Sequence, residues 1–349
     1  MSSSTTHHLA AILHSAGSPL SLEQRPTPTP SPSEVLIAVK SVALNPVDVA
    51  QQASGFHISR FPTVLGSDVA GTVLLAGASS SSSSSSSALA PGTRVAAFAS
   101  AFYTQGDPDR GALQARVCVP AAAVAPLPAH VGFDVGALLP MAVQTAWAGI
   151  HATLGVPREG PAERNQALLV WGAASSVGTA AVQVARVMGF AVYATASPKH
   201  HGYLKGLGAT RVFDYRDGGV VGDVVDAVKG DGVVLKMAYD AYGGLQQCQE
   251  VLSKLNPGGG AKLASAPPLP QPTPQTEGVE TKFVLPPDGE EERMDFYRYV
   301  FGTWLKEKLE TKEFVPSPSV KVVGGLEDAQ AGLDELKGGV SGTKLVLRV

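Results

Sequence analysis

The amino-acid sequence predicts an α/β fold with two domains, one a doubly wound parallel sheet and the other an irregular β-barrel. Three observations support this prediction. Residues 167–196 contain a buried strand, a helix and a second strand in succession. Strand-like and helix-like segments continue to alternate as far as residue 265. In contrast, residues 1–130 contain short strands separated by glycine and proline, which is typical of irregular barrels.

The composition favours a compact cytoplasmic protein. With 349 residues, of which 44% are hydrophobic, the chain can form two domains with a sizeable core. The net charge of −3 gives no support for binding to nucleic acid or to an anionic membrane. No apolar run approaches the roughly 20 residues of a membrane helix, and residues 1–8 lack the features of a signal peptide. Cys118 and Cys248 have no neighbours at metal-ligand spacing, so no metal is expected.

The first domain is expected to begin with a strand at residues 9–13. Prolines at every second position of residues 26–32 then exclude a helix. A strand rich in branched residues follows at 34–44 and leads into the Asn-Pro-Val-Asp segment at 45–48, which is expected in a loop. A plain turn and a functional loop explain this tetrapeptide equally well.

Further strands of this domain are expected at residues 68–75, 94–98 and 111–119. Nine consecutive serines at 79–87 interrupt them. Serine side chains bury no apolar surface, so this tract is predicted to be a disordered surface loop.

Near residue 133 the sequence becomes helical and rich in small residues, and the chain is expected to cross into the second domain there. The predicted cofactor domain covers residues 144–288. The first domain is therefore discontinuous and is expected to comprise residues 1–143 and 289–349.

The last part of the chain is expected to return to the first domain. Residues 267–287 are proline-rich and are expected to be mostly loop. A charged helix is predicted at 290–312. After it, a helix at 326–337 separates two strand-like segments, at 319–323 and 344–349.

The segment from Ala167 to Gly189 predicts a strand, a tight turn and a helix. Its first residues are apolar without polar alternation, which is typical of a strand covered by helices on both faces. The turn contains only glycine, alanine and serine, so backbone amides at the helix N-terminus can approach a phosphate. Of the three glycines in the G-x-G-x-x-G pattern only Gly178 is present, and a simple packing turn remains the alternative.

The end of the second strand, residues 190–196, indicates which dinucleotide is bound. In NAD-binding units this strand ends near an acidic residue that accepts hydrogen bonds from the ribose. Here it is followed by Ser197-Pro198-Lys199-His200-His201, which offers a hydroxyl and a cation but no carboxylate. The sequence therefore predicts NADP(H) as the cofactor. The alternative is that Ser-Pro merely caps the next helix.

Several segments, in their order along the chain, resemble the medium-chain dehydrogenase/reductase superfamily. The resemblance covers nearly the whole chain. Within the superfamily it is to the zinc-free quinone oxidoreductase and enoyl reductase branch, and especially to fungal trans-acting enoyl reductases that serve polyketide synthases. The segments that carry it are 43–48 (Ala-Leu-Asn-Pro-Val-Asp), 65–71 (Leu-Gly-Ser-Asp-Val-Ala-Gly), 139–140 with 145–146, 172–178, 196–199, 212–215 and 341–346.

This resemblance implies a GroES-like catalytic domain and a Rossmann cofactor domain. It also implies roles for individual residues. Asn45 and Thr145 are the candidate catalytic residues, as donors of hydrogen bonds to a developing enolate; a structural turn residue and a cofactor-orienting hydroxyl are the respective alternatives. The implied cofactor-binding residues are Asp48, Ala174, Ser175, Ser176, Val177, Ser197, Lys199, His200, Tyr215, Ser265 and Ala266.

Two departures from relatives bear on the chemistry. Where zinc-dependent relatives have Gly-His-Glu, this chain has Gly66-Ser67-Asp68, and the four-cysteine lobe is absent. Without a Lewis acid, reversible alcohol oxidation is not expected. The family often carries lysine two residues after the Asp of its Asn-Pro-x-Asp motif, and here that position is Ala50.

Together these features predict a zinc-independent NADPH-dependent reductase. Its expected substrate is the activated C=C bond of an α,β-unsaturated carbonyl, enoyl or quinone compound. The first alternative is a trans-acting enoyl reductase that meets a polyketide synthase carrier domain. The second is a non-catalytic NADPH-binding protein, which Ala50 keeps open. A monomer and a homodimer are both compatible with the sequence.

Overall fold

The computed structural model describes residues 6–78, 89–99 and 101–349. It divides into two compact units. Unit 1 comprises Met1–Met141 and Met294–Val349, and unit 2 comprises Ala142–Arg293. The sequence prediction placed these crossings two residues later and five residues earlier, respectively. The predicted disordered serine loop at 79–87 lies outside the described residues.

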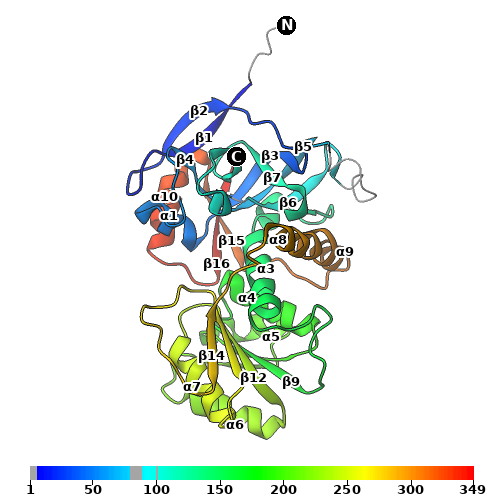
Figure 1. Cartoon of the computed structure of the whole chain (residues 1–349), viewed down its shortest axis with the longest axis vertical. Helices are drawn as coiled ribbons and strands as arrows, with labels where there is room; N and C mark the ends of the chain where they lie inside the picture. The colour runs from blue at the N-terminus through cyan, green and yellow to red at the C-terminus, as the bar shows by residue number, and fades with distance from the viewer. Residues whose placement is uncertain (1–5, 79–88, 100) are drawn as a thin grey trace. The chain divides into compact units, whose positions relative to one another are not determined.

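Unit 1 contains two β-sheets. In the smaller one the strand order is β2-β1-β4, and in the larger one it is β15-β16-β3-β5-β6-β8, with β7 also paired to β3 (Figure 1). Most neighbours are antiparallel, and β15 and β16 are parallel. The strands are β1 His7–Leu13, β2 Ser21–Pro26, β3 Glu34–Ala43, β4 Thr63–Val64, β5 Asp68–Ala76, β6 Arg94–Phe98, β7 Arg116–Pro120, β8 Val124–Pro126, β15 Ser319–Gly324 and β16 Thr343–Arg348.

Along the chain, the helices of unit 1 lie between these strands. The charged segment predicted to be helical is one continuous helical stretch, in which α8 and α9 flank a π-helical segment, Arg298–Leu305. The α-helices are α1 Pro46–Ser54, α2 Phe133–Gly136, α8 Glu290–Tyr297, which begins in unit 2, α9 Lys306–Glu310 and α10 Ala329–Lys337. Helix α3, Pro140–Trp147, follows α2 along the chain. Its first two residues belong to unit 1 and the others to unit 2.

The Asn-Pro-Val-Asp segment, expected in a loop, starts helix α1 instead. Asn45 is the N-cap residue and Pro46 the first helical residue, where a missing N–H costs nothing. The backbone N–H of Asn45 donates to Asp48 Oδ2 at 2.7 Å, so the Asp48 carboxyl reaches back to the start of its own helix. Proline and a capping acid are start signals for a helix, and here they outweigh the turn propensity of Asn-Pro.

Unit 2 is a doubly wound parallel sheet. Its strand order is β11-β10-β9-β12-β13-β14, so the order along the chain reverses between β9 and β12 (Figure 1). All five neighbouring pairs are parallel. Its strands are β9 Gln166–Trp171, β10 Ala191–Thr195, β11 Arg211–Phe213, β12 Val234–Asp240, β13 Ala261–Ser265 and β14 Val279–Phe283, and its helices after α3 are α4 Ser176–Val187, α5 His201–Leu207, α6 Val220–Asp231 and α7 Leu245–Leu255. The predicted fold class is thus confirmed.

The strand β14 lies inside the proline-rich segment that was expected to be mostly loop. It pairs with β13 over its whole length, from Ala261↔Val279 to Ser265↔Phe283. Its pattern is difficult to recognise because an edge strand exposes every second residue, here Glu280 and Lys282.

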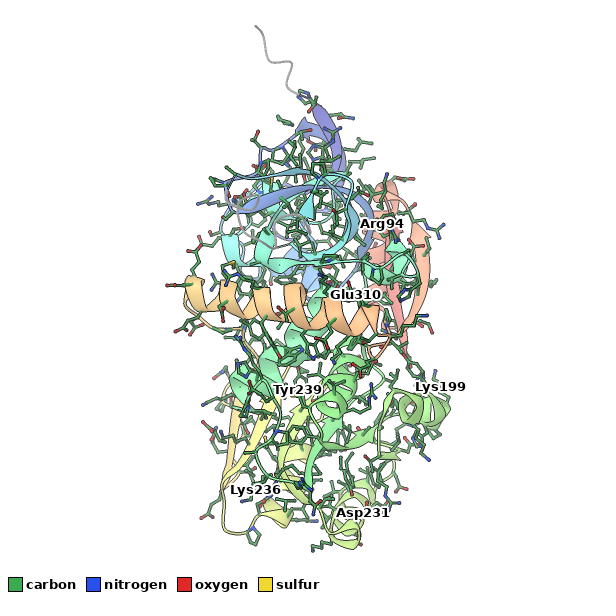
Figure 2. The ribbon with its side chains drawn as sticks, turned by 90° about the vertical axis from the view of Figure 1, so that its right-hand side faces the viewer. Arg94, Lys199, Asp231, Lys236, Tyr239 and Glu310 are labelled. Carbon is green, nitrogen blue, oxygen red and sulfur yellow. The ribbon has the colours of Figure 1, made fainter. Side chains whose placement is uncertain are left out.

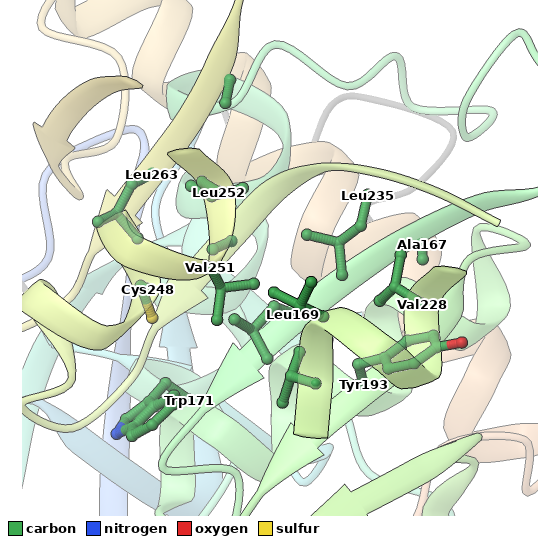
Figure 3. Close-up of a cluster of buried hydrophobic side chains, with 14 of the residues drawn as sticks. Ala167, Leu169, Trp171, Tyr193, Val228, Leu235, Cys248, Val251, Leu252 and Leu263 are labelled. Carbon is green, nitrogen blue, oxygen red and sulfur yellow. The ribbon is translucent and has the colours of Figure 1, made fainter. Parts of the chain in front are cut away.

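One face of this sheet is packed by α6 and α7 around a continuous apolar cluster (Figure 3). All six residues of β9 are buried, as its unbroken apolar run predicts. Leu169 and Trp171 of β9 meet Val251 and Leu252 of α7 in this cluster. The rigid core therefore fixes the carboxyl ends of β9 and its neighbours, where polar residues begin. Within the described residues no helix is long and apolar enough to span a membrane.

Candidate functional site

Two glycines around the turn after β9, Gly172 in the turn and Gly178 in α4, leave no room for a side chain. Gly172 has a φ of +71°, which few other residues tolerate, and a Cβ there would lie 2.6 Å from Tyr242 Cβ. At Gly178, in the first turn of α4, a Cβ would lie 2.5 Å from the carbonyl oxygen of Gly172. Thr195 of β10 stabilises the turn, because its Oγ1 accepts a hydrogen bond from the Gly172 N–H at 3.1 Å.

The start of α4 offers backbone amides to a ligand. Ser175 is the N-cap, and its Oγ accepts the N–H of Gly178 at 3.0 Å. The amides of Ser176 and Val177, the first two residues of α4, have no carbonyl one turn earlier in the helix. Ala174, Ser175, Ser176 and Val177 are all partly exposed. A close-fitting backbone, open amides and a helix N-terminus suit a pyrophosphate, so the residues present fit a dinucleotide.

Ser197 and Tyr215 meet at the carboxyl ends of β10 and β11. These strands are parallel neighbours, with Thr195 opposite Phe213, and Ser197 Oγ donates to the Tyr215 hydroxyl at 3.4 Å. Lys199 is exposed in the same segment (Figure 2). The structure thus brings these three predicted cofactor residues to one edge of the sheet.

The charged side chains near this edge differ in whether an ion pair balances their charge. Burial, followed by the neighbouring Lys199 and His201, lowers the pKa of His200. Arg216, which the sequence interpretation did not consider, lies beside the Tyr215 ring but is paired with Asp214 at 3.1 Å. Its charge is therefore largely balanced, and Lys199 is the cation whose charge no ion pair in the described chain balances.

A cavity of about 370 Å³ lies near the carboxyl ends of β12 and β13. Asp240 and Ser265 both line it, together with the first turn of α7 and prolines of the loop after β13. Asp240 Oδ1 accepts the N–H groups of Tyr242 and Gly244 at 3.1 and 2.8 Å, and burial raises the pKa of this carboxyl. Ser265 is buried and donates to the Pro267 carbonyl at 2.8 Å, whereas Ala266 is partly exposed.

Thr145 lies on α3, and its hydroxyl and its backbone carbonyl form hydrogen bonds with different side chains. Gln144 Nε2 donates to Thr145 Oγ1 at 2.8 Å. The hydroxyl of Tyr239, a buried residue of β12, donates to the Thr145 carbonyl at 2.9 Å (Figure 2). A side chain at Gly149 would collide with the Tyr239 ring, so α3 and its continuation pack closely on β12.

The other two predicted site residues, Asn45 and Asp48, belong to unit 1 and lie in a buried polar network. Asn45 Nδ2 donates to the Asp68 carboxylate at 2.8 Å and to the Ala43 carbonyl at 3.3 Å. Its Oδ1 accepts a hydrogen bond from Lys344 Nζ. Both amide hydrogens of Asn45 are therefore engaged, and it can donate to a substrate only by giving up one of these bonds.

Asp48 is completely buried, and its Oδ1 has no hydrogen-bond partner in the described part of the chain. Burial, and secondarily the charge of Asp68, raises its pKa to about 7, against the hydrogen bond from Asn45 and the charge of Lys344. A carboxyl so placed is largely protonated below neutral pH.

The positive charge in this network is the ammonium group of a side chain, Lys344. Lys344 Nζ lies 3.2 Å from Asp68 Oδ2 and donates to Asn45 Oδ1, so an ammonium group occupies the space between two oxygen acceptors. Across the described residues, no group of three histidine, cysteine, aspartate or glutamate side chains could hold a metal ion.

Sequence reasoning missed Lys344, Asp68 and Tyr239 as parts of the candidate site. Lys344 and Asp68 both lie in segments that carry the family resemblance, but nothing local marks them as partners. Thr195 had a usable signal, because it is a polar residue at the end of an apolar strand that neighbours β9.

Comparison with known proteins gives consistent results across both units. The family model of the alcohol dehydrogenase GroES-like domain matches residues 31–129, and that of the zinc-binding dehydrogenases matches residues 176–281. The chain is 45% identical over 346 residues to the trans-enoyl reductase tndF of Aspergillus flavipes, covering 97% of this chain and 98% of the relative. It is 46% identical over 287 residues to the trans-enoyl reductase tazE of Aspergillus terreus, covering 81% of this chain and 93% of that one.

Solved structures share the fold. An alcohol dehydrogenase superfamily protein from Novosphingobium aromaticivorans superposes with a TM-score of 0.79 at 21% identity, covering 98% of this chain and 99% of the other. The quinone oxidoreductase from Coxiella burnetii gives a TM-score of 0.69 at 23% identity, covering 98% and 99%. At these identities the likeness establishes the architecture alone.

Proposed function

Since the chain belongs to the medium-chain dehydrogenase/reductase superfamily, in its enoyl reductase-like branch, we propose that it reduces the activated C=C bond of α,β-unsaturated thioesters with NADPH. The superfamily is one of nicotinamide-dependent oxidoreductases. Two relatives of 45% and 46% identity are named trans-enoyl reductases, which favours a substrate carried by a polyketide synthase over a free enone. We therefore propose a carrier domain of such a synthase as its partner.

The choice of NADPH rests on the edge formed by β10 and β11. The Ser197 and Tyr215 hydroxyls lie together there, and Lys199 is exposed beside them. No carboxylate follows β10 to repel a 2′-phosphate. Two hydroxyls and a cation can together bind the three oxygens of a phosphate.

In the proposed reaction a bound NADPH would supply a hydride to the β-carbon of the substrate. Negative charge would then develop on the carbonyl oxygen, and the α-carbon would take up a proton from water. Gln144 donates to the hydroxyl oxygen of Thr145, which fixes the position of this hydroxyl. A hydroxyl held in this way can stabilise the developing charge or orient the nicotinamide amide. Asn45 contributes through the buried network rather than as a free donor.

We also propose that the reaction needs no zinc. The Lys344 ammonium bridges Asn45 and Asp68, so a positive charge is already present among these oxygen atoms. A divalent ion in the same place would face like-charge repulsion. The reduction of an activated C=C bond does not require the Lewis acid that alcohol oxidation uses.

The test is NADPH consumption by the purified protein with a panel of substrates, with and without a chelator. The panel contains an enoyl chain tethered to a carrier domain, the same chain on a small thiol, a free enone and a quinone. We expect the tethered chain to turn over fastest, with no effect of the chelator. Turnover of quinone or free enone alone would overturn the carrier-dependent role. NADPH binding without any turnover would instead support a non-catalytic protein.

A further inference from the structure

Tyr242 is a largely exposed aromatic residue beside the tight turn after β9. Its exposed fraction is 68%, the highest among the large apolar side chains of the described residues. Its ring and hydroxyl form no hydrogen bond or ring contact within the described part of the chain, where only its backbone N–H is bonded. Single exposed aromatic residues are common on protein surfaces, so exposure alone assigns Tyr242 no role.

The place of Tyr242 in unit 2 distinguishes it from other exposed residues. It follows β12 by two residues, and β12 ends beside β9, with Asp240 opposite Trp171. The strand order reverses between β9 and β12, and doubly wound sheets bind ligands at the carboxyl ends of the strands at such a reversal. A Cβ added to Gly172 would lie 2.6 Å from Tyr242 Cβ and 3.1 Å from its backbone nitrogen. Tyr242 therefore lies directly against the turn that leads into α4.

The backbone on both sides of Tyr242 is held in place. The Ala241 N–H donates to the Trp171 carbonyl at 2.9 Å. The N–H groups of Tyr242 and Gly244 both donate to Asp240 Oδ1, at 3.1 and 2.8 Å. At Gly244 a Cβ would lie 2.0 Å from the indole of Trp171, a buried residue of the sheet core. The side chain thus starts from a fixed point, and a ligand has only its two side-chain torsions to order.

The strand that precedes Tyr242 indicates which half of a dinucleotide it would meet. Strands β10 and β12 lie on opposite sides of β9. Ser197, the proposed partner of the 2′-phosphate, follows β10, whereas Tyr242 follows β12. A pyrophosphate at the start of α4 would lie between them. A dinucleotide with its adenosine at β10 would therefore extend its nicotinamide half toward Tyr242.

We propose that Tyr242 covers the nicotinamide half of the bound cofactor, from the pyrophosphate to the adjoining ribose, and holds it against the turn after β9. The inference rests on the proposed function for the identity of the ligand, but not for the substrate. The aromatic ring supplies a large apolar contact area. Excluding water from one side of the pyrophosphate also strengthens its hydrogen bonds to the backbone amides. Both contributions are the same for NADPH and NADH, which differ only at the adenosine ribose.

The test measures by calorimetry the binding of NADPH, NADH and adenosine 2′,5′-bisphosphate, which lacks the nicotinamide half. Tyr242→Ala removes the ring and Tyr242→Phe keeps it, and both leave the backbone N–H that bonds Asp240. Val234→Ala is the matched control, because Val234 is a 40% exposed apolar residue at the opposite end of β12.

Tyr242→Ala is expected to weaken NADPH and NADH binding by the same factor, about tenfold, because both cofactors lose the same ring contact. Its affinity for adenosine 2′,5′-bisphosphate should change less than about twofold, and Tyr242→Phe should stay within about threefold of wild type for all three ligands. Val234→Ala should bind all three as wild type does. Lys199→Ala should show a different pattern, with weaker binding of NADPH and of the bisphosphate but not of NADH.

Unchanged NADPH affinity in Tyr242→Ala, or an equal loss for adenosine 2′,5′-bisphosphate, would overturn the inference. An equal loss in Tyr242→Phe would overturn it too, because the hydroxyl and not the ring would then make the contact. A wild-type protein that shows the expected binding pattern but reduces no enoyl substrate would refute the proposed function alone. Normal turnover, with Tyr242→Ala binding every ligand as wild type does, would refute only the role of Tyr242.

Discussion

Lys199 and Lys344 are both lysines near candidate site residues, yet their surroundings give them different roles. Lys199 is exposed at the end of β10, and its charge can reach a ligand from solvent. Lys344 is buried and its charge is balanced by Asp68. Removing the first should therefore change ligand choice, and removing the second should change the internal order of the protein.

Lys199→Ala should weaken NADPH binding about tenfold, or about 1.4 kcal/mol, because one charged contact to the 2′-phosphate is lost. NADH affinity should change less than about twofold, since NADH lacks this phosphate. Calorimetry with both cofactors measures the difference. Lys205→Ala, an exposed lysine on α5, is the control and should affect neither. Equal losses for NADPH and NADH would contradict this assignment.

Asp48 should make stability fall with rising pH. The ordinary aspartate pKa is 3.8, and burial raises it to about 7 in the fold. Between these values the folded protein holds a proton that the unfolded chain has released, so the free energy of unfolding decreases as pH rises. Above about pH 8 both states are ionised and the loss is complete, on the order of 4 kcal/mol.

Asp48→Asn removes this ionisation, so its stability relative to wild type should increase steadily from about pH 5 to about pH 8. Denaturant unfolding across this range measures the difference. The groups that face Asp48 are Asn45, Asp68 and Lys344, which the substitution leaves in place. Asp226→Asn, an exposed change on α6, should run parallel to wild type. A pH-independent difference for Asp48→Asn would show that this carboxyl does not titrate in the fold.

At the scale of elements, the strand–turn–helix from β9 to α4 depends on space as much as on hydrogen bonds. Ala174 and Ser175 of the turn are partly exposed, but there is no room for a side chain at Gly178. A Cβ there would lie 2.5 Å from the Gly172 oxygen and 2.7 Å from Ala173 Cα, both of them backbone atoms that cannot rotate away.

Gly178→Ala should therefore push α4 away from the turn and weaken NADPH binding about tenfold or more, with a lower melting temperature. Gly206→Ala is the matched control. Gly206 lies in α5, has no atom within 4 Å of an added Cβ, and should gain up to about 1 kcal/mol from better helix propensity. Normal NADPH affinity in Gly178→Ala would mean that the turn does not contact the pyrophosphate.

At the scale of the whole molecule, cofactor binding and stability are linked. A ligand at 100 times its dissociation constant stabilises the folded protein by about 2.7 kcal/mol. NADPH should therefore raise the melting temperature of the full chain at concentrations where NADH has little effect. A thermal shift series with both cofactors checks this prediction. A larger shift with NADH would contradict the NADPH assignment.

Much of the fold could be predicted from periodicity in the sequence. The apolar run of β9, the helical spacing of α4 and the alternation up to β13 identified the parallel sheet, and the Ser197–Lys199 segment was located at its edge. The prediction was less successful where local signals compete or are weak. Pro46 and Asp48 start a helix within a turn-like segment, and β14 is an edge strand surrounded by prolines.

The sequence by itself determined the α/β fold with its parallel sheet, the tight turn between β9 and α4 and the polar strand ends, because these depend on patterns within a few dozen residues. Only the tertiary structure decided that Lys344 pairs with Asp68 and bonds Asn45, which is 299 residues away along the chain. It also decided that both amide hydrogens of Asn45 are engaged and that burial raises the pKa of Asp48. These properties depend on which charges are brought together away from water, and burial of this kind arises from contacts between distant segments.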